Sequence, residues 1–376
     1  MRDTVDHYAP QRRRPWPIIL SVAALIILAL GWSGFWYFAA SQAQTRLAAW
    51  REREATLGRI YDCATQTVGG FPFRMEVRCA DPSAELRNAQ PPLSLKAKDL
   101  LATVQVYQPD LVITEIAGPA SVAEPGRPPA FTANWTLAQS SVRGLPSALE
   151  RLSLVFDRLD VTRHDNGPAQ PAGTAEHLEL HVRQAPRLPQ DEPAIDLAVQ
   201  LRKGTLPQVS QLAGTPVDAD ISMVLRGLRD FSAKPWPQRL RELQAANGRL
   251  EIRQARVQQG DILATGQGAL TLTAQGRLDG EIRLTVAGLE QLVTALGLDR
   301  AMGRVSQNAA ERIVPGLNLE RLLGPRGNAA LAAAGVAMLG QPAELEGRKA
   351  VMLPLRFADG AVFLGQLMVG QMQPLF

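Results

Sequence analysis

The sequence predicts a mainly β protein of the α+β class, in which an N-terminal transmembrane helix precedes a large curled antiparallel sheet with a few helices. Three observations support this fold class. An uncharged apolar run occupies residues 18–40. From Leu93 onward, short segments alternate apolar and polar residues with the period of two that is typical of strands. Breaks rich in glycine and proline, of which the chain has 31 and 27, separate these segments as turns would.

The apolar run Ile18–Ala40 is long enough to be a transmembrane helix. At 1.5 Å per residue it would measure about 35 Å, and a bilayer core is about 30 Å thick. No charged residue lies between Arg14 and Arg46, and three consecutive arginines, 12–14, precede the run. Because arginines favour the cytoplasmic side, we expect residues 1–17 to be the cytoplasmic tail of an inner-membrane protein with a periplasmic C-terminal body.

A cleaved signal peptide is the alternative interpretation, because Ser41-Gln42-Ala43 has small residues at the offsets of a cleavage site. The apolar run exceeds the roughly 7–15 residues of a signal-peptide core, and bulky aromatic residues occupy its exit side. These features favour an uncleaved anchor. Both interpretations export the body.

The charge balance argues against a nucleic-acid partner. The formal net charge is +4, and the first 17 residues, with four arginines and two aspartates, carry +2 of it. The basic residues of the body are dispersed rather than gathered into a stripe, so we expect no binding of nucleic acid.

Cys63 and Cys79 are the two cysteines of the chain, and we expect them to form a disulfide. They enclose a turn-like centre, 69–73, between strand-like arms at 65–68 and 73–77. An oxidising periplasm permits such a bridge, which for a loop of this size would stabilise the fold by about 3 kcal/mol. A two-cysteine metal site is the alternative, but no histidine or further cysteine lies nearby in the sequence.

The segment 41–60 is predicted to be a juxtamembrane helix, since Leu47, Trp50 and Leu57 recur among charged residues. The β-rich body then occupies 61–376. Strands are expected at 93–97, 102–107, 111–116, 131–137, 152–161, 176–182, 195–202 and 219–225, with breaks at 118–129 and 166–173.

A helix between two groups of strands gives a candidate sub-boundary near 230–248. It begins at Pro235-Trp236-Pro237, since the first turn accepts proline, and it ends at Asn247-Gly248. An antiparallel meander is expected next, and Asp359-Gly360 predicts a hairpin near the C-terminus. The expected strands are 249–257, 262–265, 269–274, 280–287, 350–357 and 361–369, with joints at 259–261 and 278–280, and the expected helices are 289–296, 298–314 and 329–339.

Several of these segments resemble a known family. They are Gly69-Gly70-Phe71-Pro72-Phe73-Arg74 with Cys79, the meander from Gly260-Asp261-Ile262 through Leu278-Asp279-Gly280, and the C-terminal Arg356-Phe357-Ala358-Asp359-Gly360 through Leu364-Gly365. Together they are similar to the domain of unknown function 2125, an alphaproteobacterial family. The resemblance implies a single-pass envelope protein without assigned chemistry. The meander is also reminiscent of AsmA-like proteins, and that fold analogy implies handling of lipid between membranes.

One cluster of residues is the strongest candidate for a metal site. His177, Glu179 and His181 would share one face of a strand, as zinc ligands do, but no third histidine or cysteine lies at ligand spacing. We therefore expect these three side chains to form a solvent-exposed face. The opposite face would be buried and consists of Leu178, Leu180 and Val182.

Two further patterns are weaker. His164-Asp165 lies in a loop, and the sequence lacks the Gly-x-Ser-x-Gly elbow that would supply a nucleophile. Gly266-Gln267-Gly268 lacks the third glycine and the strand-to-helix setting of a dinucleotide-binding loop, so a bend or bulge between strands is expected. We therefore expect no catalytic, metal-binding or cofactor-binding residue and no enzymatic activity.

Two functions of different kinds fit this fold class. A curled sheet beside a membrane presents a concave face, which could bind and carry a lipid or another amphiphile. The alternative is a non-catalytic envelope scaffold or assembly protein, whose apolar residues would form a closed core. An open apolar groove larger than a few hundred Å² would favour the carrier. The candidate groove residues are Leu154, Phe156, Ile195, Leu197, Val199, Leu270, Leu272, Ile282 and Leu284.

Overall fold

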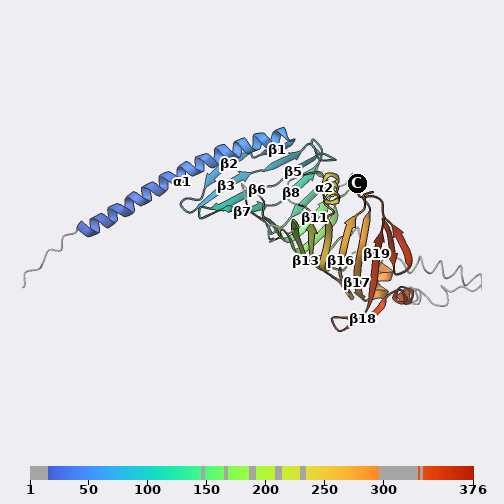
Figure 1. Ribbon diagram of the computed structural model, residues 1–376. Coiled ribbons are helices and arrows are strands. Elements are labelled where there is room, and N and C mark those ends of the chain that lie inside the picture. Colours follow the sequence, from blue (N-terminus) through green and yellow to red (C-terminus); the bar gives the residue numbers. More distant parts are fainter. Residues whose placement is uncertain are drawn as a thin grey trace, which may run out of the picture.

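A computed structural model gives the fold as one long helix followed by a curled, unclosed antiparallel sheet (Figure 1). The fold class expected from the sequence is therefore confirmed. The structure describes residues 16–144, 149–164, 168–185, 192–207, 214–228, 234–295, 329–330 and 333–376. The three arginines at 12–14, Asp165 and the helix expected at 298–314 lie outside the described residues.

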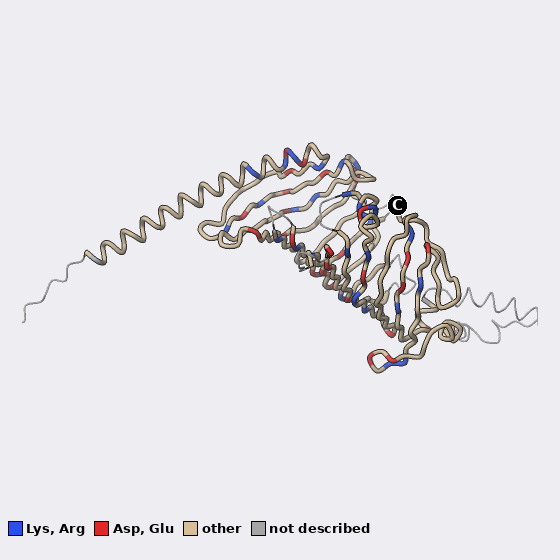
Figure 2. The backbone as a smooth tube through the Cα atoms, in the orientation of Figure 1, with Lys and Arg blue, Asp and Glu red and all other residues tan. Residues whose placement is uncertain are grey.

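Helix α1 (Trp16–Thr56) is continuous over 41 residues and therefore about 62 Å long. It is long and apolar enough to cross a membrane, as an anchor or a signal sequence would be. Charged residues appear along it only from Arg46 onward (Figure 2). The sequence predicted that this helix ends at residue 60, but it ends at Thr56. It ends earlier because Gly58 takes a φ of +74° and a strand begins at Arg59.

The sheet begins with nine strands, which together with β10 form two wings. They are β1 (Arg59–Asp62), β2 (Thr65–Gly69), β3 (Arg74–Ala80), β4 (Ser83–Leu86), β5 (Leu93–Lys96), β6 (Asp99–Gln105), β7 (Gln108–Ala117), β8 (Ala120–Ala123) and β9 (Phe131–Asn134). They are followed by β10 (Leu137–Arg143) and the long β11 (Arg151–Arg163).

Both wings start from β11, because different parts of this long strand pair with different neighbours. One part pairs with β10, and the first wing continues through β7, β6 and β3 to β2. The other part pairs with β9, and the second wing continues through β8, β5 and β4 to β1. Each wing thus ends in an edge strand, β1 or β2, and α1 runs along both of them (Figure 1).

On its other side β11 continues into a meander of long strands. Strand β14 pairs directly with β15, so the sheet is continuous across residues 227–248. These strands are β12 (Gln170–Gln184), β13 (Ala194–Gly204), β14 (Val217–Arg226), β15 (Arg249–Gln259), β16 (Ile262–Leu272), β17 (Leu278–Ala287), β18 (Gln341–Leu345), β19 (Arg348–Ala358), β20 (Ala361–Leu364) and β21 (Leu367–Gln371). Within the part of the chain that the structure describes, the other helices are α2 (Trp236–Ala245) and α3 (Leu289–Ala295), and residues 333–338 are also helical.

The register gives the meander one apolar face, which continues from strand to strand. Residues that pair directly across an antiparallel ladder lie on the same face of the sheet. One such row crosses eight strands without a charged residue. Its members are Phe156, Leu178, Leu201, Ala219, Val257, Ala264, Val286 and Val351.

Helices cover this apolar face at two places. Leu243 of α2 packs with Ile195 and Leu228 in one buried cluster. Near the C-terminus, α3 and the helical residues 333–338 cover a second buried cluster, which includes Val286 and Leu353. No described helix covers the apolar face between these two clusters and the part of the sheet beneath α1. The apolar side chains on that stretch are only half-buried.

Several local expectations from the sequence were wrong. The strand expected at 361–369 is a hairpin of two strands, β20 and β21, because Gly365 turns the chain between them with a φ of +61°. The break expected at 166–173 contains the start of β12 at Gln170. The expected break at 118–129 contains β8, because its small residues pair with β5 and β9. Residues 278–280 lie inside β17, since the turn before it is made at Gly276, which has a φ of +71°. Residues 266–268 lie inside an unbroken β16, and the bulge is on the facing strand β15, between Ile252 and Ala255.

Candidate functional site

A large hollow lies beneath the C-terminal part of α1. It is a partly open cavity of about 1210 Å³, hereafter the α1 cavity, lined by α1, both wings and β11. Pockets for drug-sized ligands usually measure roughly 300–1,000 Å³, so this space is large enough for a ligand with long chains. Its lining is predominantly apolar, and Met75, Val77, Leu100, Val104 and Ile116 are among the lining residues of the first wing.

The small size of many lining side chains explains why the space stays open. The two wings curve toward each other beneath α1 without pairing at their edges, and many of the positions that line the space between them carry short side chains. Seven of the lining residues are alanines, namely Ala43, Ala49, Ala84, Ala97, Ala102, Ala120 and Ala133. A fully packed core would leave few voids larger than a water molecule.

Larger side chains seal the two sides of the α1 cavity. Trp50 of α1 stacks on Tyr61 of β1, with ring centroids 4.9 Å apart. At the opposite wall, Trp135 contacts Phe156 edge-on and donates its Nε1–H to the carbonyl oxygen of Ile116 at 2.7 Å. The indole N–H of Trp135 is thereby satisfied without water, and both tryptophans line the α1 cavity.

Cys63 and Cys79 form the disulfide that the sequence predicted, and both residues line the α1 cavity. Their Cα atoms are 5.4 Å apart. Cys63 lies in the link between β1 and β2, where the two wings meet, and Cys79 lies in β3. The bridge therefore fixes the meeting point of the two edge strands beneath α1.

The charged residues that line the α1 cavity are mostly basic. Arg46, Arg51 and Arg53 extend from α1 and Lys96 from β5, against one acidic residue, Asp62. Arg51 donates from Nη2 to Cys63 Sγ at 3.1 Å. Among the described residues, neither Arg46 nor Lys96 forms an ion pair with a carboxylate. These cations can therefore attract an anionic group to the α1 cavity.

The structure places the nine residues of the predicted groove on the apolar face, but at four different locations along it. Phe156 lines the α1 cavity. Ile195, Leu197 and Leu272 pack in or against the cluster under α2, and Leu284 packs under the C-terminal helices. The others are half-buried on the uncovered stretch of the face, and they are Leu154, Val199, Leu270 and Ile282.

The uncovered stretch explains one wrong expectation. Leu180 was predicted to be buried, yet its side chain is 36% exposed. It pairs with Leu154 and Val199 in the middle of the apolar face, where no described helix covers the sheet. The apolar face of the meander thus continues from Phe156 in the α1 cavity to a stretch that no described helix covers.

The opposite face of the meander carries the predicted metal candidates, which instead bond to one another. His177 Nδ1 lies 2.6 Å from Asp157 Oδ1, and His177 Nε2 lies 2.7 Å from Glu179 Oε1. The second Glu179 oxygen lies 2.7 Å from His181 Nε2, and His181 Nδ1 lies 2.9 Å from Ser153 Oγ. The described residues contain no group of three or more ligands arranged for a metal ion.

The hydrogen bonds of this chain of side chains shift two pKa values. The carboxylate of Asp157, and after it that of Glu179, raises the pKa of His177 above its ordinary value. Hydrogen bonds from His181 and His177 lower the pKa of Glu179. Both shifts follow from pairing a cation with an anion, so the charged forms of His177 and Glu179 stabilise one another.

Hydrogen bonds link Ser153 to His181 and His181 to Glu179, an order that superficially resembles the activation of a serine nucleophile. However, Ser153 lies in β11 between two paired strands, where ladder bonds engage the neighbouring backbone N–H groups that could stabilise an oxyanion. The cluster therefore acts as a cross-strand polar network. His164, the other histidine considered, contacts Thr132 Oγ1 at 2.8 Å.

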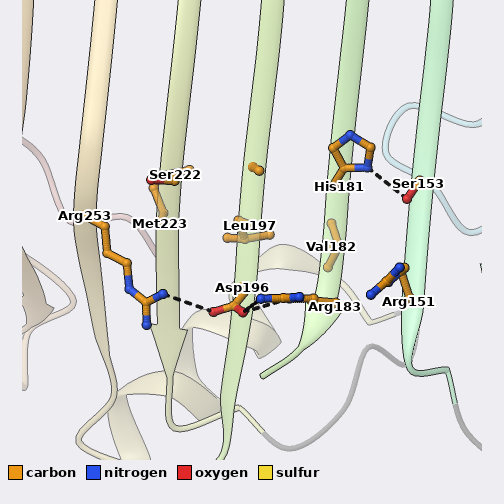
Figure 3. A pocket seen from close by; sticks show the side chains of 11 residues that line it. Arg151, Ser153, His181, Val182, Arg183, Asp196, Leu197, Ser222, Met223 and Arg253 are labelled. Carbon is orange, nitrogen blue, oxygen red and sulfur yellow. Dashed lines mark hydrogen bonds and ion pairs between the residues drawn. The ribbon is translucent and has the colours of Figure 1, made fainter. Parts of the chain in front are cut away.

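A second, smaller hollow of about 490 Å³ lies on this polar face beside His181 (Figure 3). Asp196 bridges two of the three arginines at its margin, Arg183 at 2.9 Å and Arg253 at 4.0 Å. Arg151 lies beside Arg183 on the neighbouring strand. The side chains of Arg183 and Arg253 are about half exposed, whereas that of Asp196 is 17% exposed, so solvent screens the two pairs from the arginine side.

The sequence interpretation missed most of the α1 cavity. It placed the groove on the meander, whereas the hollow lies between α1 and the wings, and only Phe156 belongs to both. Two signals were present. Leu47 and Trp50 give the charged part of α1 an apolar side, and alanines occupy inward positions of the short strands.

Comparison with protein families gives one match. A family model described as "Uncharacterized protein conserved in bacteria (DUF2125)" matches residues 36–373. This match covers the last part of the apolar run, the wings, the meander and the C-terminal hairpins. No curated protein matches the sequence.

Proposed function

Because the chain belongs to the DUF2125 family of uncharacterized bacterial proteins, whose description assigns no ligand, we propose a function from its geometry. The protein is a membrane-anchored carrier of an amphiphilic lipid, whose acyl chains lie in the α1 cavity. The observation that carries this proposal is the hollow itself, which is wide, apolar and bordered by cations.

The energetics favour an apolar occupant. Each methylene group that leaves water contributes about 0.8 kcal/mol. A chain with ten buried methylenes would therefore contribute about 8 kcal/mol, from which the entropy cost of immobilising the lipid must be subtracted. Water in the same space would find few hydrogen-bond partners, because the lining is mostly aliphatic.

The charge at the margin selects the headgroup. Arg46, Arg51 and Lys96 line the cavity, and the side chains of Arg46 and Lys96 are exposed to solvent. Together the three cations favour an anionic headgroup such as a phosphate diester or a carboxylate. The uncovered apolar face of the meander gives acyl chains a continuous surface beyond the α1 cavity. A carrier could use this surface to move a lipid away from the anchor.

The proposal places the body in the periplasm and α1 in the inner membrane. The arginines at 12–14 favour a cytoplasmic N-terminus, and a disulfide persists in an oxidising compartment. A periplasm-dependent reporter fused after Phe376 should be active if this orientation is right.

Lipid binding can be tested by filling the α1 cavity. The variant Ala102→Phe with Ala133→Phe places two rings in the hollow, whereas Thr103→Phe is a matched control, because Thr103 neighbours Ala102 on β6 but faces the other side. We expect the full-length wild type and the control to retain phospholipid after extensive detergent washing, and the cavity-filled variant to retain at least tenfold less.

The measurement is lipid mass spectrometry, with uptake of a fluorescent phosphatidylglycerol as a second readout. All three proteins carry the same α1, so lipid that merely surrounds the anchor cancels in the comparison. Equal retention in the filled variant, with its thermal unfolding unchanged, would exclude the α1 cavity as the binding site. Absence of lipid from all three proteins would favour the envelope scaffold instead.

A further inference from the structure

The turn between β2 and β3 reaches back along the membrane part of α1. Trp32 donates its Nε1–H to the carbonyl oxygen of Pro72 at 2.9 Å, and Trp36 donates to the carbonyl oxygen of Arg74 at 3.0 Å. Phe71 packs edge-on against Trp36, with ring centroids 5.6 Å apart. The turn is therefore held at a defined height on the helix.

That height can be compared with the thickness of a bilayer. A hydrocarbon core of about 30 Å corresponds to about 20 helical residues. Counted from Trp16, where α1 begins, such a span ends near Phe35. Trp32 then lies about 5 Å inside the boundary, and the turn beside it lies at the same depth. A span over Ile18–Ala40 would place the turn deeper still.

The exposed side chains at this end suit that depth. Phe71 is 49% exposed and Phe73 is 64% exposed, although both are large apolar residues. The neighbouring turn between β6 and β7 presents Tyr107, which is 75% exposed, and the preceding Val106 N–H donates to the Phe73 carbonyl oxygen at 3.0 Å. Aromatic side chains are enriched where headgroups meet hydrocarbon.

Backbone carbonyl groups of the turn have hydrogen-bond partners within the protein, which suits an environment with little water. The Gly70 carbonyl oxygen accepts from the Arg74 N–H, and the carbonyl oxygens of Pro72, Phe73 and Arg74 accept from Trp32, Val106 and Trp36. Pro72 has no N–H to satisfy. Unpaired carbonyl groups would be costly near hydrocarbon.

We infer that the tips of the β2–β3 and β6–β7 turns insert into the membrane leaflet that faces the body, with Phe71, Phe73 and Tyr107 at the boundary between headgroups and acyl chains. The inference rests on the proposed role of α1 as a membrane anchor. Met75, Val104 and Pro109 line the α1 cavity and lie within a few residues of these tips. Insertion therefore brings one end of the cavity to the membrane surface.

Site-specific photo-crosslinking can test the inference in the full-length protein. The probe is p-benzoylphenylalanine in place of Phe73 or Tyr107, with the protein in nanodiscs of phosphatidylcholine and phosphatidylglycerol. The matched control replaces Trp236, which is 76% exposed but lies in α2 on the body. A probe in place of Ile26, in the apolar part of α1, reports whether the helix spans the bilayer.

We expect lipid adducts at Phe73 and Tyr107 at no less than five times the yield at Trp236. Adducts at Ile26 with yields at Phe73 and Tyr107 no higher than at Trp236 would overturn the inference and leave the anchor intact. Absence of adducts at Ile26 would overturn both the anchor and the insertion.

Discussion

The disulfide between Cys63 and Cys79 should make a measurable contribution to the stability of the body. We consider the double variant Cys63→Ala, Cys79→Ala, which removes the bridge without leaving a free thiol. The two cysteines are separated by 16 residues along the chain. In the loop-entropy model, a cross-link over this distance destabilises the unfolded chain by about 3 kcal/mol.

This free energy converts into a shift of the unfolding temperature. The described strands between Arg59 and Gln371 belong to one continuous sheet. An entropy of unfolding of about 2.1 cal/mol/K per residue gives about 0.67 kcal/mol/K for a body of roughly 320 residues. Loss of 3 kcal/mol should therefore lower Tm by about 4–5 °C if the sheet unfolds as one unit. If the wings unfold separately from the meander, fewer residues share the loss and the shift becomes larger.

The assay is thermal unfolding of the full-length protein in detergent, followed by circular dichroism in the β-sheet region. Wild type with dithiothreitol should match the double variant, and the reductant should not change Tm of the variant. A variant within 1 °C of the oxidised wild type would refute the argument that the bridge restricts the unfolded chain at the meeting point of β1 and β2.

Two further predictions concern the meander. The raised pKa of His177 means that its stabilising contribution is complete below about pH 6.5 and is lost as the pH rises through the folded-state pKa. The lowered pKa of Glu179 means that its contribution is complete above about pH 4.5 and is lost as the pH falls further, so Glu179 is ionised at both pH 6 and pH 9. The Tm difference between wild type and His177→Gln should therefore be larger at pH 6 than at pH 9. A Tm difference independent of pH would contradict this reasoning. Gly268→Ala would place a Cβ 2.1 Å from the Glu281 carbonyl oxygen and should cost about 1–3 kcal/mol in urea unfolding. Gly266→Ala, whose Cβ would lie 3.7 Å from the nearest atom, is the matched control, and equal effects of the two variants would show that backbone crowding is not the cause.

The sequence predicted most strands because their signals are local. Alternation within residues 195–202 and the Asp359-Gly360 turn each specify a strand or hairpin without reference to distant residues. The strands β1, β4, β8, β10 and β18 were missed. Three of them, β1, β4 and β8, have four residues each, too few for a period to be evident, and each of these pairs with a strand that is distant in the sequence. The strands β10 and β18 are longer, but few large apolar residues alternate within them.

The α1 cavity was missed for a different reason. Its walls come from α1, from β1 and from strands of both wings, and their meeting depends on the double pairing of β11. The alternation of residues shows which side chains face inward, but it does not show whether they fill the space that they face. In this molecule alanines at positions such as Ala102 and Ala133 leave it open.

The continuity of α1 has a practical consequence for anyone who wishes to truncate the chain. Residues 43–53 form one wall of the α1 cavity, and Trp50 shields the outermost strand of the second wing through its contact with Tyr61. A fragment that starts at Arg59 would lose that wall and would leave two unprotected strand edges, which invite self-association. A start near Ser41 would remove the hydrophobic span and keep the wall, so the cut belongs inside the helix and not at its end.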